Sequence, residues 1–176
     1  MTKSRADLFA FLDTLGIAHA TVEHPPLHTV EESRALRGEL PGGHAKNLLV
    51  KDKKSRVFLV VAREDLPLDL KRLHGVIGAQ GRVSFCSADQ MWDLLGVKPG
   101  SVTPFGVIND TAHAVTVVLD AGLVALDPQN FHPLENTATT TIARDDLLRF
   151  LEAAGHTPVI TELPLQEAGT DAAAEA

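Results

Sequence analysis

Residues 47–62, NLLVKDKKSRVFLVVA, contain two apolar, β-branched runs on either side of a short charged turn. The first run extends from Asn47 to Asp52 and the second from Arg56 to Ala62. Runs of this length and composition with a polar turn between them are typical of a β-hairpin. The centre of the chain therefore predicts two neighbouring strands joined without a crossover helix.

Working outward from this hairpin, the sequence predicts short strands with helices placed irregularly among them. Ser4 and Ser87 are expected N-caps, and Thr29 with Glu32 has the spacing of a capping box. A second hairpin is expected around the Ala121–Gly122 pair. The remaining strands are expected over residues 17–23, 82–86, 114–120, 123–127, 137–142 and 157–161, and the helices over 5–15, 30–36, 69–76, 88–95 and 145–154. This order favours an α+β domain with a curved, mixed, largely antiparallel sheet over a doubly wound parallel sheet.

Length and composition limit the class of protein further. A chain of 176 residues with 44% hydrophobic and 22% charged residues is typical of one folded domain. We place this domain over residues 1–161 and expect an acidic, disordered tail over 162–176. Cys86 is the single cysteine and the first thirty residues do not resemble a signal peptide, so we expect a cytoplasmic protein. No apolar run is long enough to predict a membrane span.

Charge is unevenly distributed along the chain. The net charge is -7, yet residues 46–98 contain ten Lys or Arg and six Asp or Glu, a local balance of +4. This pattern argues against a protein that coats nucleic acid with its whole surface and is compatible with a bounded contact to a phosphate-bearing ligand. A solvated, lysine-rich hairpin turn at residues 51–56 explains the same charges without any ligand.

Metal and cysteine chemistry find little support in the sequence. His24 and His28 have helical ligand spacing, but Pro25 and Pro26 lie between them and exclude a helix interior. Because paired cysteines and a His-Glu-x-x-His motif are both absent from the sequence, we expect no metal site. Cys86 follows a phenylalanine in an expected strand, which is more typical of a small buried hydrophobe than of a nucleophile.

Three loop segments combine polar residues with glycine or proline. They are His44-Ala45-Lys46-Asn47 after a Gly-Gly pair, the turn-rich stretch 96–106, and Phe131-His132-Pro133-Leu134-Glu135-Asn136 before an expected strand. Glycines allow backbone N–H groups to approach a ligand closely, so the stretch 96–106 is a candidate for holding a carbonyl or an oxyanion. Taken singly, each segment is also explained as an ordinary solvated turn.

Together, the three segments resemble the YbaK and prolyl-tRNA synthetase editing-domain superfamily, and within it the freestanding deacylases that remove alanine from mischarged tRNA(Pro). The matching motifs are Lys46-Asn47-Leu48, Gly100-Ser101-Val102-Thr103-Pro104 with Phe105-Gly106, Asn109-Asp110, and His132-Pro133 with Asn136 and Thr139-Thr140. The resemblance runs from the first helix to about Thr161. It implies a single editing-like domain with a barrel-like sheet surrounded by helices.

The resemblance also implies a reaction and a set of site residues. Such enzymes hydrolyse the aminoacyl ester at the tRNA 3′ end with no cofactor, metal or protein nucleophile. The implied catalytic groups are Lys46, which would hold the terminal phosphate as a charged ammonium, and the backbone of Gly100 and Ser101, which would polarise the ester carbonyl. The residues implied to contact the aminoacyl group are Asn47, Val102, Thr103, Pro104, Phe105, His132 and Asn136.

The partners and alternatives follow from the same resemblance. The expected substrate is the acceptor end of tRNA(Pro) charged with alanine, with prolyl-tRNA synthetase or an elongation factor as transient partners and no contact with DNA or membrane. Lys51, Lys53, Lys54 and Arg56 are the expected contacts to the acceptor stem. Two alternatives stay open at this point: a deacylase for cysteine-charged tRNA(Pro), and a noncatalytic module that binds tRNA or a synthetase.

Overall fold

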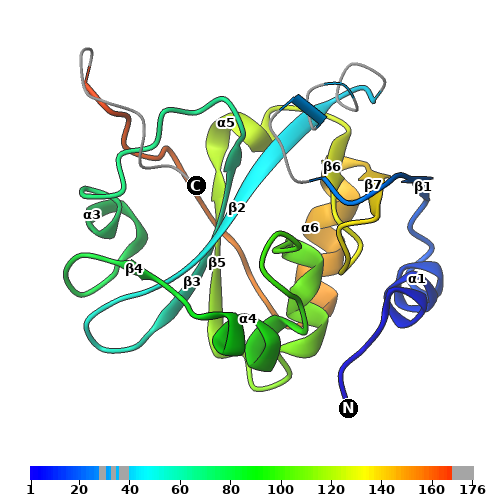
Figure 1. Ribbon diagram of the computed structural model, residues 1–176, viewed down its shortest axis with the longest axis horizontal. Helices are drawn as coiled ribbons and strands as arrows, with labels where there is room; N and C mark the ends of the chain where they lie inside the picture. The colour runs from blue at the N-terminus through cyan, green and yellow to red at the C-terminus, as the bar shows by residue number, and fades with distance from the viewer. Residues whose placement is uncertain (28–30, 33–34, 36–39, 168–176) are drawn as a thin grey trace.

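The structure, a computed structural model, describes residues 1–27, 31–32, 35 and 40–167. In this part of the chain, eight strands form one sheet in the order β1-β7-β6-β2-β3-β5-β8, with β4 also paired to β2. Four of the strand pairings are antiparallel and three are parallel. The prediction of a mixed, largely antiparallel sheet in an α+β domain is confirmed, and helices surround this sheet (Figure 1).

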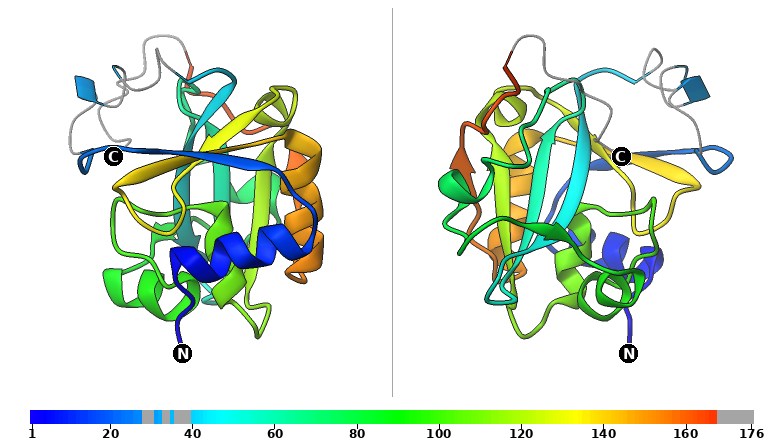
Figure 2. Two further views of the ribbon diagram at one scale, coloured as in Figure 1. Left: turned by 90° about the vertical axis from the view of Figure 1, so that its right-hand side faces the viewer. Right: turned by 60° about the vertical axis from the view of Figure 1, so that its left-hand side comes forward.

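The strands are β1 (His19–Glu23), β2 (Gly43–Lys51), β3 (Val57–Arg63), β4 (Ser84–Phe85), β5 (Val115–Asp120), β6 (Gln129–Phe131), β7 (Ala138–Ile142) and β8 (Val159–Thr161). The helices are α1 (Arg5–Thr14), α3 (His74–Ile77), α4 (Ala88–Leu95), the 3₁₀ helix η1 (Pro104–Asn109), α5 (Ala121–Val124) and α6 (Arg144–Ala153). The predicted hairpin is the antiparallel pair β2–β3. Figure 2 shows β1 and β7 side by side at one edge of the domain.

Strand β2 changes partners along its length, and this change positions the candidate site. Its first residues, Gly43 and His44, pair with β6, and its last residues, Val50 and Lys51, pair with β4. Among the described residues, positions 45–48 of β2 pair with β3 and with no other strand. The other edge of β2 is therefore open between β6 and β4.

The alternation of side chains along β2 and β3 divides the core into two clusters. Leu49, Leu59 and Val61 face a large cluster that also receives side chains from α1, α4, η1 and α6. The intervening residues of β3, including Phe58 and Val60, face a smaller cluster closed by the segment 66–77 and by Leu163. Because side chains on a strand alternate between its two faces, the two clusters bury opposite faces of the β2–β3 pair.

Local capping signals placed two helices correctly. Ser4 and Ser87 both form capping boxes, with Asp7 and Gln90 as the reciprocal partners. Gly96 ends α4 with φ +65°, in the left-handed region that favours glycine at a helix end.

Several predicted elements differ in the structure. The strand predicted over 123–127 is wrong: Asp120 accepts a hydrogen bond from the Gly122 N–H and starts the short helix α5 instead. The helix predicted over 69–76 is reduced to α3, because the Asp69 carboxylate accepts from the Lys71 N–H and the Arg72 guanidinium and forms a turn. The predicted strand 82–86 is shortened to β4. The predicted helix over 30–36 lies largely outside the described residues.

The predicted tail boundary also differs. We expected disorder from Glu162, but residues 162–167 pack against the segment 66–72. Leu163 is buried, Leu165 forms a bridge with Leu68, and the Pro164 carbonyl accepts from the Asp69 N–H at 2.8 Å. The Gln166 N–H donates to the Pro67 carbonyl at 2.8 Å. Residues 162–167 therefore belong to the folded domain, and the predicted boundary at 161 is too early. Residues 168–176 lie outside the described part of the chain.

This packing predicts the effect of truncation. Ending the chain after Thr161 should lower the melting temperature by about 3–10 °C, because it exposes the surface that buried Leu163 covers. A chain ending after Glu167 keeps every contact described for this segment and is the control. Equal melting temperatures for the two truncated proteins, measured by circular dichroism, would contradict the prediction.

Candidate functional site

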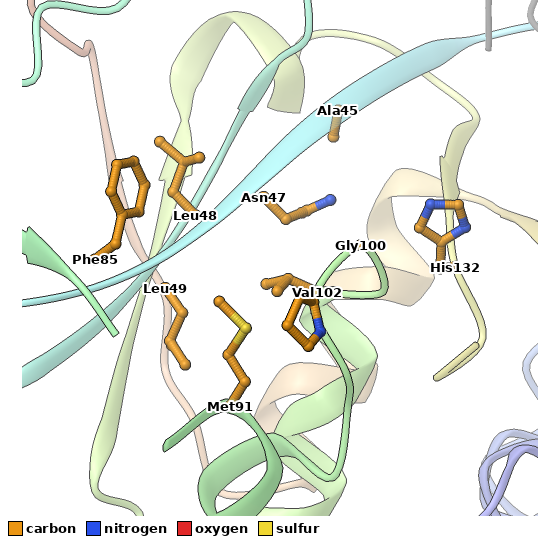
Figure 3. A pocket seen from close by; sticks show the side chains of 10 residues that line it. Ala45, Asn47, Leu48, Leu49, Phe85, Met91, Gly100, Val102 and His132 are labelled. Atoms are coloured by element: carbon orange, nitrogen blue, oxygen red, sulfur yellow. The ribbon is translucent and has the colours of Figure 1, made fainter. Parts of the chain in front are cut away.

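A cavity of about 300 Å³ opens at the unpaired edge of β2 (Figure 3). Its walls come from β2, β4, α4, the loop that follows α4, and the residue after β6. The lining residues are Ala45, Asn47, Leu48, Leu49, Phe85, Met91, Pro99, Gly100, Val102 and His132. Four of these, Asn47, Gly100, Val102 and His132, were predicted from the sequence as site residues, and the fold brings them together from three separate segments.

Two asparagine side chains, Asn47 in the cavity wall and Asn136 beside the Gly100 loop, have buried amide oxygens without partners among the described residues. Asn47 Oδ1 and Asn136 Oδ1 are both buried, and neither accepts a hydrogen bond from any described residue. Asn136 is fixed because its Nδ2 donates to the Leu27 carbonyl at 3.0 Å. It lies against the loop, since a Cβ added at Gly100 would come within 3.7 Å of Asn136 Nδ2. A buried acceptor without a donor costs about 1–3 kcal/mol, so this pair of oxygens is suited to a ligand that donates hydrogen bonds.

His132 adds a third acceptor to the same end of the cavity. Its Nδ1 lies 3.1 Å from the Ala138 carbonyl, and because a carbonyl only accepts, this nitrogen must donate. Burial lowers the pKa of His132 below its ordinary value of 6.5, and the nearby His24 lowers it further. The ring is therefore neutral at pH 7 with its acceptor at Nε2. Figure 3 shows the Asn47 side chain extending toward the His132 ring, with its amide nitrogen at the end nearer the ring.

The loop after α4 presents backbone to the cavity. Gly100 has φ +89°, a conformation that L side chains rarely adopt. The Ser101 N–H donates to the Lys98 carbonyl at 3.0 Å and closes the turn. The N–H groups beside it, of Gly100 and Val102, have no acceptor among the described residues and are the groups of this turn that can donate to a ligand.

The second half of the predicted loop has a different role. Thr103, Pro104 and Phe105 were expected to contact the aminoacyl group, but they are buried and do not line the cavity. Thr103 Oγ1 accepts from the Phe105 N–H and starts η1, with Pro104 in its first turn. Phe105 packs edge-on against the rings of Phe131 and Phe150. These three residues support the loop from the core, and their contact with the substrate stays a prediction.

Comparison with known proteins places this chain in a family. A model of the aminoacyl-tRNA editing domain matches residues 24–150. The chain belongs to the aminoacyl-tRNA editing domain family. It is 42% identical over 158 residues to prolyl-tRNA synthetase associated domain-containing protein 1 of Danio rerio, covering 89% of this chain and 85% of that protein.

Two further relatives extend the comparison. The prolyl-tRNA editing protein ProX of Acetoanaerobium sticklandii is 38% identical over 157 residues, covering 89% of this chain and 95% of its own. A crystal structure described as a candidate trans-editing enzyme for prolyl-tRNA synthetase superposes with a TM-score of 0.69 at 21% identity, covering 94% of this chain and 99% of that one. The superposition shows that the fold of this editing domain is shared.

Lys46 does not line the cavity of the editing domain. Alternation along β2 places it on the face opposite Asn47, and its Nζ donates to the Leu66 carbonyl. Leu48, on the same face as Lys46, does line the cavity together with Asn47 and Leu49 from the other face. The cavity therefore wraps around the open edge of β2, and Lys46 lies beside its rim.

In the basic turn between β2 and β3, two of the four side chains are held by contacts within the protein. Arg56 pairs with Asp52 at 3.1 Å and also donates to the Gly78 carbonyl, and Lys51 Nζ donates to Gln90 Oε1 at 3.2 Å. Arg56, Lys53 and Lys54 are all exposed, but Arg56 is engaged in these contacts. Of the four residues predicted to contact the acceptor stem, Lys53 and Lys54 are therefore the best placed, and their contact with RNA stays a prediction.

Asp52 organises this turn, and its titration predicts a pH dependence. Burial raises the pKa of the Asp52 carboxyl, but hydrogen bonds from the N–H groups of Gln80, Arg56 and Lys54 and from the Arg56 side chain outweigh it, so the pKa falls from 3.8 to about 2. A lowered folded-state pKa stabilises the protein above the unfolded pKa, and this contribution disappears as the pH falls from about 4 to about 2.

The measurement is urea denaturation of the parent and of Asp52→Asn at several pH values. At pH 5 the variant should be less stable than the parent, because the amide cannot accept all of these hydrogen bonds as a carboxylate does. The difference should shrink as the pH falls below about 4. If the difference in unfolding free energy between parent and variant stayed constant down to pH 2.5, the lowered pKa of Asp52 would be contradicted.

Several lining residues were not predicted from the sequence, among them Phe85 and Met91. They belong to β4 and α4, which reach the cavity through tertiary packing, and neither lies in a recognisable motif.

Among the described residues, no group of three or more His, Cys, Asp and Glu side chains is arranged to bind a metal. No helix in the described ranges is both long and apolar enough to cross a membrane. Burial raises the pKa of the Cys86 thiol, which disfavours the thiolate.

Proposed function

We propose that this protein is a trans-editing deacylase that hydrolyses the alanyl ester of mischarged tRNA(Pro). Family membership and the 38% identity to the protein named prolyl-tRNA editing protein ProX support editing of this tRNA. The observation that supports ester recognition most directly is that Asn47, with its unpartnered Oδ1, and neutral His132 line the same cavity, with Asn136 Oδ1 beside the Gly100 loop. The role of these residues is part of the proposal.

The acceptor cluster suits the α-ammonium group of an aminoacyl ester. An ammonium has three N–H donors and no acceptor, and the residues in and beside this end of the cavity include two unpartnered amide oxygens and one imidazole nitrogen. A neutral imidazole accepts a hydrogen bond from a cation without repelling it. The cluster would therefore fix the amino acid by its amine and point its carbonyl carbon along the cavity.

The glycine loop would then act on the ester carbonyl. With the amine held by Asn47, the carbonyl oxygen would lie against the Gly100–Val102 backbone, whose free amides would donate to it and stabilise the oxyanion of the tetrahedral intermediate. Water attacks the carbonyl carbon, the bond to the ribose oxygen breaks, and that oxygen leaves as a hydroxyl after taking a proton. The neighbouring ribose hydroxyl would position the attacking water, so the protein supplies no nucleophile.

The size of the cavity would decide which amino acids are hydrolysed. A synthetase pocket built for proline rejects the smaller alanine weakly, because missing methylenes change binding by only about 1–3 kcal/mol. A second site that admits alanine and excludes proline restores fidelity. Val102 and Ala45 would form the wall near the side chain of the amino acid.

The test is hydrolysis of alanyl-, cysteinyl- and prolyl-tRNA(Pro) by the purified protein. Alanyl-tRNA(Pro) should be deacylated fastest and prolyl-tRNA(Pro) spared. Asn47→Ala should lower kcat/KM without lowering the melting temperature, because it removes an unpartnered buried oxygen. Fastest turnover of cysteinyl-tRNA would reassign the substrate, and no turnover of any ester would refute the enzymatic proposal.

A further inference from the structure

The cavity has an apolar end, away from the acceptor cluster, that the proposed reaction does not use. Phe85 lies there beside Leu48, and His132 lies at the opposite end (Figure 3). The Phe85 ring is 46% exposed, although a phenylalanine gains about 1.5–3 kcal/mol when it is fully buried. An aromatic ring exposed within a site is positioned to contact a ligand.

The backbone holds this ring in place. Phe85 pairs with Val50 in the β2–β4 ladder, and the next residue, Cys86, is buried with its N–H donating to the Leu49 carbonyl at 2.9 Å. Residues directly opposite in a ladder point to the same face, so Phe85 lies on the face of β2 that also bears Leu48 and Lys46. Lys46, Leu48 and Phe85 therefore form a row along one face of the sheet.

The dimensions of this row fit one nucleotide. Lys46 and the Val50–Phe85 pair are four positions apart on β2, about 13 Å at 3.3 Å per residue. Between them the open edge of β2 gives access to Asn47 on the other face. A nucleotide lying along the row would place its phosphate at the Lys46 ammonium, its base at Phe85, and its acylated ribose over the open edge.

We propose that Phe85 is the platform on which the terminal nucleobase of the aminoacylated RNA stacks, with Leu48 extending the apolar surface. The inference rests on the proposed function, since it takes the ester to lie at Asn47 and His132. Stacking on an aromatic ring uses the face of the base and not its hydrogen-bonding edge. The platform therefore contributes to affinity and positions the ribose without selecting the amino acid.

Substitutions at Phe85 test the platform. Phe85→Leu removes the π-face while keeping an apolar side chain, and should raise KM for an alanylated acceptor-stem minihelix about tenfold while kcat stays within about twofold. Phe85→Tyr keeps the ring and should retain the parent KM. Trp92 is also 46% exposed but lies outside the cavity, so Trp92→Leu is the matched control and should leave KM unchanged. An unchanged KM for Phe85→Leu would overturn the proposal.

A binding measurement separates the platform from the proposed function. Isothermal titration calorimetry with the unacylated trinucleotide CCA requires no turnover. The parent and Trp92→Leu should bind it, and Phe85→Leu should bind about tenfold more weakly. If that pattern holds while no ester is hydrolysed, the platform stands and the deacylase proposal fails. If the parent hydrolyses alanyl-tRNA but all variants bind CCA equally, the platform is refuted and the deacylase proposal stands.

Discussion

Replacing Asp110 with Ala should destabilise the protein by about 3–5 kcal/mol. The Asp110 side chain is 2% exposed and accepts hydrogen bonds from the Ala114 N–H at 3.0 Å, from the Val115 N–H at 2.8 Å and from His156 Nε2 at 2.8 Å. Removing the carboxylate leaves these donors buried without an acceptor, at a cost of about 1–3 kcal/mol each. The contacts join the residue after η1, the start of β5 and the segment after α6, so their loss affects three elements that pack in the large core cluster.

Urea denaturation at pH 7 measures this loss, and two further variants show its origin. The Asp145 side chain is 78% exposed and pairs with its neighbour Arg144, so Asp145→Ala should change stability by less than about 1 kcal/mol. A double-mutant cycle of Asp110→Ala with His156→Ala isolates the pair itself. A loss below about 1 kcal/mol for Asp110→Ala would show that the buried network contributes little.

Local signals in the sequence predicted the fold where short-range physics decides the conformation. The β2–β3 hairpin and the helices capped by Ser4 and Ser87 depend on contacts within a few residues, and all three are confirmed. The segment 123–127 was misassigned because a short apolar run is compatible with either a strand or a helix. The Asp120 cap, which selects the helix, also lies within the strand β5.

The sequence predicted only part of the candidate site, because burial and strand pairing depend on residues far apart in the chain. Sequence motifs place residues on the same loop but do not show which of them are buried, so Phe105 was grouped with Gly100 although its ring lies in the core. Asn109 and Asp110 belong to the matched family motifs, yet they tie loops together and do not line the cavity. Phe85 reaches the cavity through a two-residue strand, and no local pattern predicts that pairing.

Lys46→Ala should lower kcat/KM for alanyl-tRNA(Pro) by about ten- to a hundredfold, mainly through KM. A hydrogen bond between charged groups contributes about 1.5–3 kcal/mol, which gives this range. In the free protein Nζ donates to the Leu66 carbonyl, and substrate binding would exchange this bond for one to the phosphate. The open edge of β2 allows this exchange, because Leu48 on the same face already borders the cavity.

A phosphate-free substrate separates an anchor from a group that acts on the ester. Alanyl-adenosine offers the ester and the base but no phosphate, so the parent and Lys46→Ala should hydrolyse it at equal rates. Lys46→Arg should recover part of the lost kcat/KM on alanyl-tRNA(Pro). Lys71 is an exposed lysine, and the control variant Lys71→Ala should not lower kcat/KM. Equal activity of Lys46→Ala and the parent on the tRNA would remove the anchor role. A matching loss on alanyl-adenosine would place the ammonium at the reacting ester, on the other side of the open edge from where its side chain lies in this structure.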